Sequence, residues 1–170
     1  MVAVVAGGWV QAGLAWAEGG EVPLPDTGQS KSYTTTFGED SDYIKPRGYT
    51  VNGDGTVSDQ VTKLVWQQAD DGTTRDWATA KSYCQGLVLA GKDDWRLPSI
   101  KELITLVHAD KYNPAIDTTV FPGTKSSWYW SSTSDAGNSS YAWNVYFFNG
   151  YVDGYHTSNN NYVRCVRSGQ

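Results

Sequence analysis

Hydrophobic and polar residues alternate in the last third of the chain, a pattern that predicts half-buried β-strands. Trp143, Val145 and Phe147 are predicted to face a core, and the residues between them are predicted to face outward. Gly, Asn and Ser residues divide this region into short strands. The predicted strands lie within residues 128–134, 141–150, 151–158 and 161–168.

A helical period replaces this alternation in two earlier segments. The first predicted helix lies in residues 73–91, where Gly91 is placed to end it. One face of this helix carries Trp77, Ala80, Cys84 and Leu87.

The second predicted helix has a clear start. Ser99 and Glu102 have the S-x-x-E spacing of a capping box, and Pro98 comes directly before them. Its apolar face consists of Ile100, Leu103, Ile104 and Val107.

A turn signal lies near the start of the folded region. The run Asn52–Gly55 separates two apolar stretches and predicts a hairpin, because Asn and Gly accept positive φ angles. Asn52, Asp54 and Asp59 leave a calcium loop as the alternative. The hairpin is favoured because the Glu that closes an EF-hand loop is missing.

The N-terminal residues carry an export signal rather than a folding pattern. Residues 1–17 are small and apolar and end in Ala15-Trp16-Ala17, which predicts a signal-peptide remnant with its cleavage site. The usual basic start is missing, which leaves a buried or membrane helix as the alternative. Residues 18–48 form an irregular lead-in, and residues 49–170 form the domain. No later segment could span a membrane.

Composition narrows the class of partner. The chain has 170 residues, of which 39% are hydrophobic and 14% aromatic, enough for one folded domain with a core. A net charge of -5 argues against nucleic acid, anionic lipid and strongly sulfated polysaccharide, since these need a basic face. We therefore expect an exported protein, in the periplasm, at the cell surface or secreted.

The two cysteines are predicted to form one disulfide. Cys84 lies on the core face of the first predicted helix, and Cys165 lies in the last predicted strand. An unstrained bridge over this loop would stabilise the fold by roughly 4 kcal/mol. Buried free thiols are the alternative, and a catalytic thiol is disfavoured because neither histidine has a reason to lie nearby.

No other group of residues predicts catalysis or a cofactor. His108 and His156 lack companion ligands at a metal-binding spacing. The acid pairs at 70–71 and 93–94 are better interpreted as solvated loop residues. We expect a chain that is not an enzyme and that has no metal site and no cofactor.

The outward positions of the C-terminal third are the candidate ligand-binding residues. Tyr offers rigid contact area, while Asn and Ser offer adaptable hydrogen bonds, as in antibody binding sites. Ordinary strand and turn preferences explain the same composition equally well. The predicted site consists of Tyr141, Asn144, Tyr146, Phe148, Tyr151, Asp153, Tyr155, His156, Ser158, Asn159 and Asn160.

Over roughly residues 22–168, the chain resembles the bacterial family that includes the C-terminal domain of the Legionella collagen-like protein. The motifs that carry the resemblance are LVWQ, SYC, DDWRLPSIKELITLV, PAID, FPGTKSSWYWSSTS, YAWNVYF and YVRCVR. The resemblance implies an α+β, C-type-lectin-like fold, with two helices packed on a small, twisted, mostly antiparallel sheet. A disulfide from the first helix to the last strand fits that fold.

Related branches of this fold suggest two further hypotheses. The formylglycine-generating branch implies an enzyme, but its chemistry needs an active-site cysteine pair that this chain cannot spare. Retroelement-diversified proteins vary a C-terminal stretch through Asn codons, and residues 138–162 are rich in the resulting residue types.

We interpret the chain as a binding module for a surface protein or a glycan. The E-P-N and Q-P-D triplets of calcium-dependent sugar binding do not occur in it. A structural or oligomerising surface domain is the alternative, and the oligomeric state is left open.

Overall fold

The computed structural model describes Thr27, Gln29 and residues 47–169. The predicted signal segment, residues 1–17, lies outside the described residues. So does the predicted lead-in, residues 18–48, except for Thr27, Gln29 and residues 47 and 48. The described part contains two helices and seven strands, so the predicted α+β class is confirmed. In chain order they are β1 (Tyr49–Val51), β2 (Thr56–Asp59), β3 (Leu64–Gln67), α1 (Trp77–Gln85), α2 (Ile100–Ile104), β4 (Trp128–Ser134), β5 (Tyr141–Tyr146), β6 (Tyr151–His156) and β7 (Val166–Ser168).

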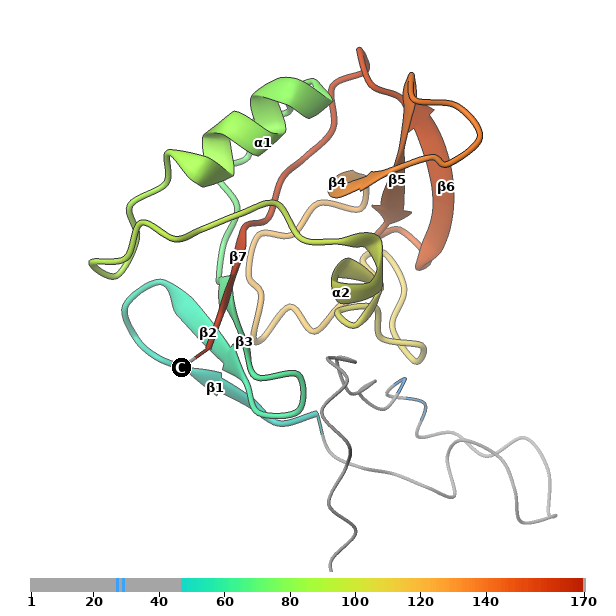
Figure 1. Cartoon of the computed structure of the whole chain (residues 1–170). Coiled ribbons are helices and arrows are strands. Elements are labelled where there is room, and N and C mark those ends of the chain that lie inside the picture. The colour runs from blue at the N-terminus through green and yellow to red at the C-terminus, as the bar shows by residue number, and fades with distance from the viewer. Residues whose placement is uncertain (1–26, 28, 30–46, 170) are drawn as a thin grey trace, which may run out of the picture.

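The strands form two sheets, where the sequence predicted a single small sheet. One sheet has the order β1-β2-β3-β7 and the other β4-β5-β6, with antiparallel neighbours throughout. Figure 1 shows the two sheets on either side of α2.

The C-terminal segment passes from one sheet to the other, which shortens the last predicted strand. Tyr162 pairs with Tyr129 of β4, and β7 begins only at Val166, beside β3. Between them, the fully buried Arg164 guanidinium donates to the carbonyl oxygens of Gln67 and Gln68, at 3.3 and 2.6 Å. Residues 161–165 are therefore held between the sheets, and Cys165 lies just before β7.

The predicted hairpin is confirmed. β1 and β2 pair in register on either side of residues 52–55, and Gly53 and Gly55 have φ angles of 79° and 85°. The carboxylate of Asp54 accepts a hydrogen bond from the Thr56 amide at 3.0 Å, and that of Asp59 accepts one from the Val61 amide at 2.8 Å. Within the described residues, no three His, Cys, Asp or Glu side chains gather as metal ligands.

The first helix is shorter than predicted. α1 begins at Trp77, where the carboxylate of Asp76 accepts from the Thr79 amide at 2.8 Å, and it ends at Gln85 before Gly86. The chain then turns at Ala90 and Gly91, whose φ angles are 54° and 68°, with Leu89 and Lys92 paired across the turn. Gly91 therefore closes a tight turn instead of the helix.

The capping box of the second helix is confirmed, although the helix stops before Val107. The Ser99 hydroxyl accepts from the Glu102 amide, and the Glu102 carboxylate accepts from the Ser99 amide. The guanidinium of Arg47 donates to the carbonyl oxygens of Thr105, at 2.9 Å, and of Val107. These contacts satisfy carbonyl groups that a longer helix would have paired internally.

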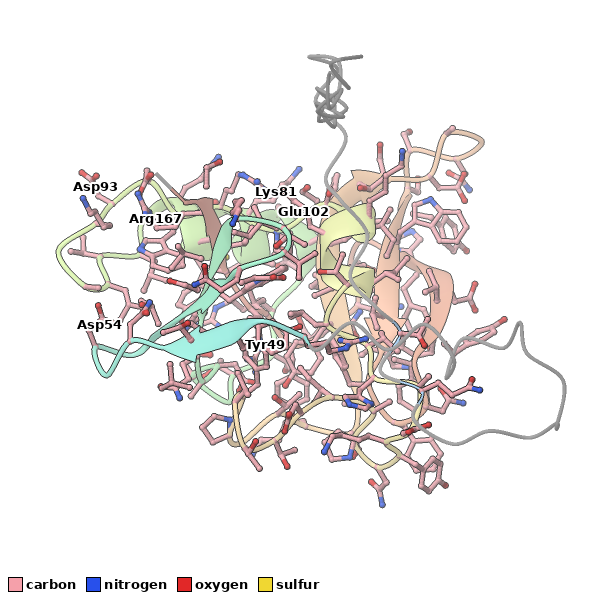
Figure 2. All side chains as sticks on the ribbon, turned by 90° about the horizontal axis from the view of Figure 1, so that it is seen from below. Tyr49, Asp54, Lys81, Asp93, Glu102 and Arg167 are labelled. Carbon is pink, nitrogen blue, oxygen red and sulfur yellow. A yellow bond between two sulfur atoms is a disulfide. The ribbon has the colours of Figure 1, made fainter. Side chains whose placement is uncertain are left out.

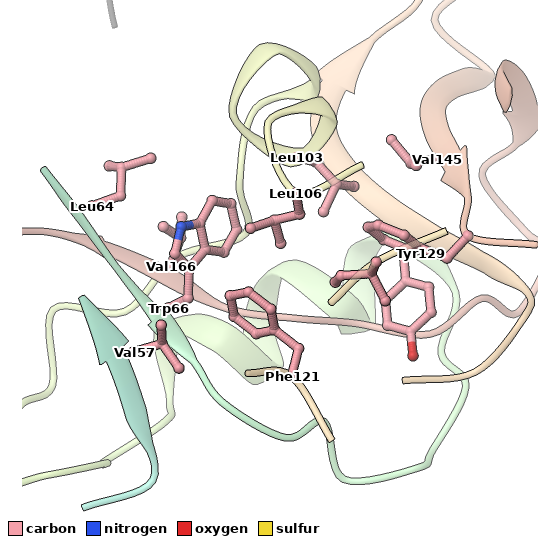
Figure 3. Packing of buried hydrophobic residues seen from close by; sticks show 11 residues of the cluster. Val57, Leu64, Trp66, Leu103, Leu106, Phe121, Tyr129, Val145 and Val166 are labelled. Carbon is pink, nitrogen blue, oxygen red and sulfur yellow. The ribbon is translucent and has the colours of Figure 1, made fainter. Parts of the chain in front are cut away.

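Two apolar clusters hold these elements together. The first joins both sheets to α2, and Figure 3 shows its packing around Trp66, Phe121 and Tyr129. The second packs α1 against Trp95 and Trp130. The predicted disulfide is confirmed inside the second cluster, where Cys84 of α1 is joined to Cys165.

Candidate functional site

Strand register gathers aromatic side chains on one face of the three-stranded sheet. Trp128 of β4 lies opposite Tyr146 of β5, and Tyr146 lies opposite Tyr151 of β6. Residues directly opposite each other in an antiparallel sheet share a face, so these three rings form one row across it. Tyr155, four residues beyond Tyr151, lies on the same face.

The rings on this face of the sheet contact one another. Trp128 stacks on Tyr146 with their centroids 4.6 Å apart, and Tyr146 stacks on Phe148 at 5.6 Å. Tyr155 lies 4.8 Å from Trp128, and Tyr151 meets it edge-on at 6.3 Å. Pairs of this kind contribute about 0.5–1.5 kcal/mol each beyond burial.

A loop far away in the sequence adds one more ring. The Asn113 amide donates to the carbonyl oxygen of Phe148 at 2.9 Å, and the Ala115 amide donates to that of Phe147 at 2.6 Å. These bonds place the ring of Tyr112 4.5 Å from that of Phe148. We define the aromatic face as Tyr112, Trp128, Tyr146, Phe148, Tyr151 and Tyr155.

The aromatic face is open to solvent. Tyr112 is 66% exposed and Tyr151 is 58% exposed, while the other four residues are half-buried. Large contiguous apolar patches are typical of interaction sites, which makes this face the candidate site.

One exposed carboxylate belongs to this surface. Asp153 lies between Tyr151 and Tyr155 on the same side of β6. Its Oδ1 accepts a hydrogen bond from the Gly154 amide at 2.8 Å. No lysine or arginine occurs from Ser126 to Val163, so the sheet supplies no cation to neutralise Asp153.

Asn144 was predicted to face outward, and this prediction is wrong. Its side chain is fully buried. On this face of the sheet, Asn144 lies between Trp128 and Tyr155, and the rings of these two residues contact each other above it. The amide group of Asn144 donates to the carbonyl oxygen of Ala142 at 2.8 Å, and its Oδ1 accepts from Asn161 at 2.9 Å.

The remaining predicted site residues lie on the opposite face of the sheet or in the segment after β6. Tyr141 and His156 are paired on the opposite face of the sheet, 5.5 Å apart between ring centroids. The His156 ring bonds the Ser158 hydroxyl at 2.7 Å, beside the exposed residues Asn159 and Asn160. The structure thus brings together Tyr146, Phe148, Tyr151, Asp153 and Tyr155, and it places Tyr141 and His156 on the opposite face. Ser158, Asn159 and Asn160 lie in the exposed segment that follows β6.

Sequence reasoning missed two members of the aromatic face. Trp128 lies in a predicted strand, and pairing that strand with β5 in register would have placed it beside Tyr146. Tyr112 carries no such signal, because only the loop contacts to residues 147 and 148 bring it there.

A buried polar network anchors β4 beneath the aromatic face. The Tyr129 hydroxyl donates to Asp70 at 2.5 Å and accepts from the Lys125 amide at 2.8 Å. Arg164 lies 3.5 Å from the same Asp70 carboxylate, so Asp70 is a buried ion-pair partner, and its interpretation as a solvated loop residue is wrong. Burial raises the pKa of Tyr129, so at neutral pH its hydroxyl keeps its proton and donates to Asp70. Burial lowers the pKa of Arg164, and the neighbouring Asp70 and Tyr129 oppose this effect.

A groove of about 640 Å³ lies over the four-stranded sheet. Lys63, Lys92 and Arg167 line it, and Arg167 is held by Asp94 through two bonds of 2.6 and 3.0 Å. Trp95 also borders the groove, but it is only 2% exposed and offers little ring surface. We therefore place the candidate site on the aromatic face.

Fold and surface together define a disulfide-linked α+β domain that presents an aromatic face on its three-stranded sheet. The chain belongs to the Lcl C-terminal domain family, whose model matches residues 55–167. No curated protein matched the chain. In the part of the chain that the structure describes, no helix is long and apolar enough to cross a membrane.

Proposed function

We propose that this domain is an exported recognition module that binds a surface protein or a glycan through its aromatic face. The observation that carries the proposal is the contiguous layer of rings with Tyr112 and Tyr151 largely exposed. Tyr and Trp are enriched in binding sites because they bury a large area at low entropic cost.

A C-type-lectin-like fold is part of this proposal. The two helices, the antiparallel sheets and a disulfide that ties α1 to the C-terminal segment support it. Membership of the Lcl C-terminal domain family supports it as well, because the resemblance to that family implies this fold.

Export is proposed on independent grounds. Disulfides persist in oxidising compartments, and the chain joins its only two cysteines in one. The signal-like pattern of residues 1–17 points the same way.

Binding is proposed in place of catalysis. The formylglycine-generating chemistry of a related branch needs a reactive cysteine pair, and both cysteines of this chain lie in a buried structural disulfide. The titratable groups around Tyr129 and Arg164 are engaged in holding β4.

The proposal is tested by replacing Tyr146, Tyr151 and Tyr155 together with Ala. We expect binding to an array of cell-surface proteins and glycans to fall at least about tenfold, since buried aromatic anchors dominate such contacts. Circular dichroism and a thiol titration establish that the variant is folded and disulfide-bonded. Unchanged binding by a folded variant contradicts the assignment.

An oligomerising domain is the second candidate, favoured by the exposure of Tyr112 and Tyr151. It predicts that the same rings contact another copy of the chain. Analytical ultracentrifugation over a range of concentrations separates the two: a binding module keeps the same mass with and without the three tyrosines, whereas an oligomerising domain dissociates when they are removed.

Retroelement diversification remains a hypothesis about how such a face arises. The structure restricts where substitutions are tolerated, because Asn144 and Asn161 are buried and bonded to each other, while Ser158, Asn159 and Asn160 are exposed. Sequencing the locus tests it, and a locus without a reverse transcriptase and an adenine-rich template repeat argues against it.

A further inference from the structure

The charge on the three-stranded sheet is one-sided. Between Ser126 and Val163 the chain contains Asp135 and Asp153 but no lysine or arginine. Asp153 is exposed among the rings of the face. A partner that approaches this surface therefore meets aromatic rings and a negative charge together.

Elsewhere the domain pairs its rings with its own cations. Arg75 lies 3.9 Å from the centre of the Tyr83 ring, and Lys81 lies 3.3 Å from that of Trp77. Among residues 47–169, no such contact involves a ring of the aromatic face. No cation of the described residues therefore occupies these rings, and an aromatic ring of this kind attracts a cation that approaches its face.

Asp153 is placed to accept such a cation. It alternates with Tyr151 and Tyr155 along β6, so its carboxylate lies on the same side as both rings. Its Oδ1 binds only the neighbouring Gly154 amide, and Oδ2 has no hydrogen bond to the described residues. A guanidinium group can stack on an aromatic ring and pair with a carboxylate at the same time.

The same surface is less suited to a glycan than to a cation. A neutral sugar would find the tyrosine hydroxyls and Asp153 as hydrogen-bond partners, but the amide of Asn144 is buried and already bonded to Ala142 and Asn161. A sulfated or acidic sugar would be repelled by Asp153 and would find no lysine or arginine on the sheet.

We propose that the aromatic face receives a basic segment of a partner protein, whose arginine or lysine side chains stack on Tyr151 and Tyr155 and pair with Asp153. This inference rests on the proposed function, because it names the ligand class for the same surface. A neutral glycan and a second copy of the chain are the competing occupants.

The test uses the full chain and two peptide arrays. One array carries randomised twelve-residue peptides, and the other carries the same peptides with citrulline for arginine and acetyl-lysine for lysine. We expect the peptides that bind the wild type to be enriched about threefold in arginine and lysine, and the neutral array to lose this binding.

Matched variants separate local recognition from net charge. Asp153→Asn and Asp93→Asn change the net charge equally, and Figure 2 shows Asp93 at the far end of the molecule from the three-stranded sheet. We expect the enrichment to disappear in Asp153→Asn and in Tyr151→Ala, and to persist in Asp93→Asn and in Tyr151→Phe, which keeps the ring.

Three outcomes overturn the inference. The first is equal binding to both arrays. The second is an equal loss of the arginine and lysine enrichment in Asp93→Asn and Asp153→Asn. The third is binding to a neutral hexasaccharide that depends on Tyr151, without any preference for basic peptides. The last result leaves the proposed function standing and changes only the ligand class. A fourth outcome, binding that no substitution in the aromatic face alters, contradicts both the inference and the proposed function.

Discussion

At the scale of single residues, Asn144 shows what alternation can and cannot predict. The alternation along residues 143–147 correctly places Val145 and Phe147 in the core, and it places Asn144 on the other face. Trp143, which was predicted to face the core as well, is only half-buried and belongs to neither apolar cluster. The face that carries Asn144 is covered too, by rings that reach over it from Trp128 and Tyr155. A polar residue is stable there because Asn161 and the Ala142 carbonyl group satisfy its side chain.

This role of Asn144 predicts a loss of stability on substitution. Asn144→Ala leaves the buried Asn161 amide without its acceptor, so the free energy of unfolding should fall by about 1–3 kcal/mol. Asn160→Ala is the matched control, since Asn160 is exposed in the same segment and should change stability by less than about 0.5 kcal/mol. Urea unfolding measures both, and equal effects would contradict the buried placement.

At the scale of elements, α2 depends on contacts at its two ends. The helix has only five residues, too few to be stable alone. At its start, both Glu102 oxygens accept bonds from Arg96, at 2.8 and 2.6 Å, in addition to the capping box with Ser99. At its end, Arg47 binds the carbonyl oxygens of Thr105 and Val107.

The start of α2 predicts a pH dependence. Burial alone would raise the pKa of Glu102, but the bonds from Arg96 and Ser99 outweigh it and hold the pKa below its ordinary value. A carboxyl group with a lowered pKa in the folded state contributes stability above its ordinary pKa, and that stability is lost as the pH falls through the folded value.

Glu102→Gln isolates this charge, because glutamine also completes a capping box. We expect the variant to be less stable than the wild type by about 1 kcal/mol near neutral pH, since Arg96 is partly exposed. The difference should shrink as the pH falls below 4.5, the ordinary pKa of glutamate, and through the lower pKa of Glu102 in the folded state. Lys101→Gln, on the exposed side of the helix, is the control. A gap in unfolding free energy that stays constant with pH would show that the charge is not involved.

At the scale of the whole molecule, local signals predicted the elements better than their arrangement. The capping box at Ser99 and the turn at Asn52–Gly55 are local, and both are confirmed. The division into two sheets depends on buried Arg164, whose partners Gln67 and Gln68 lie almost a hundred positions earlier in the chain. No local pattern encodes such a pairing.

The candidate site divides in the same way. Tyr146, Phe148 and Tyr151 were predictable because strand alternation selects a face. Tyr112 was not, because a loop carries it to Phe148. Tyr141 was assigned to the same site, and strand register places it on the opposite face of the sheet.

The measurement that tests the central claim most directly compares Tyr151→Ala with Tyr141→Ala. Both residues are exposed tyrosines on adjacent strands, but only Tyr151 belongs to the aromatic face. Titration with the best-bound array component should show affinity reduced about tenfold by Tyr151→Ala and unchanged by Tyr141→Ala. Equal losses in the two variants, or a loss only in Tyr141→Ala, would contradict the assignment of ligand binding to the aromatic face.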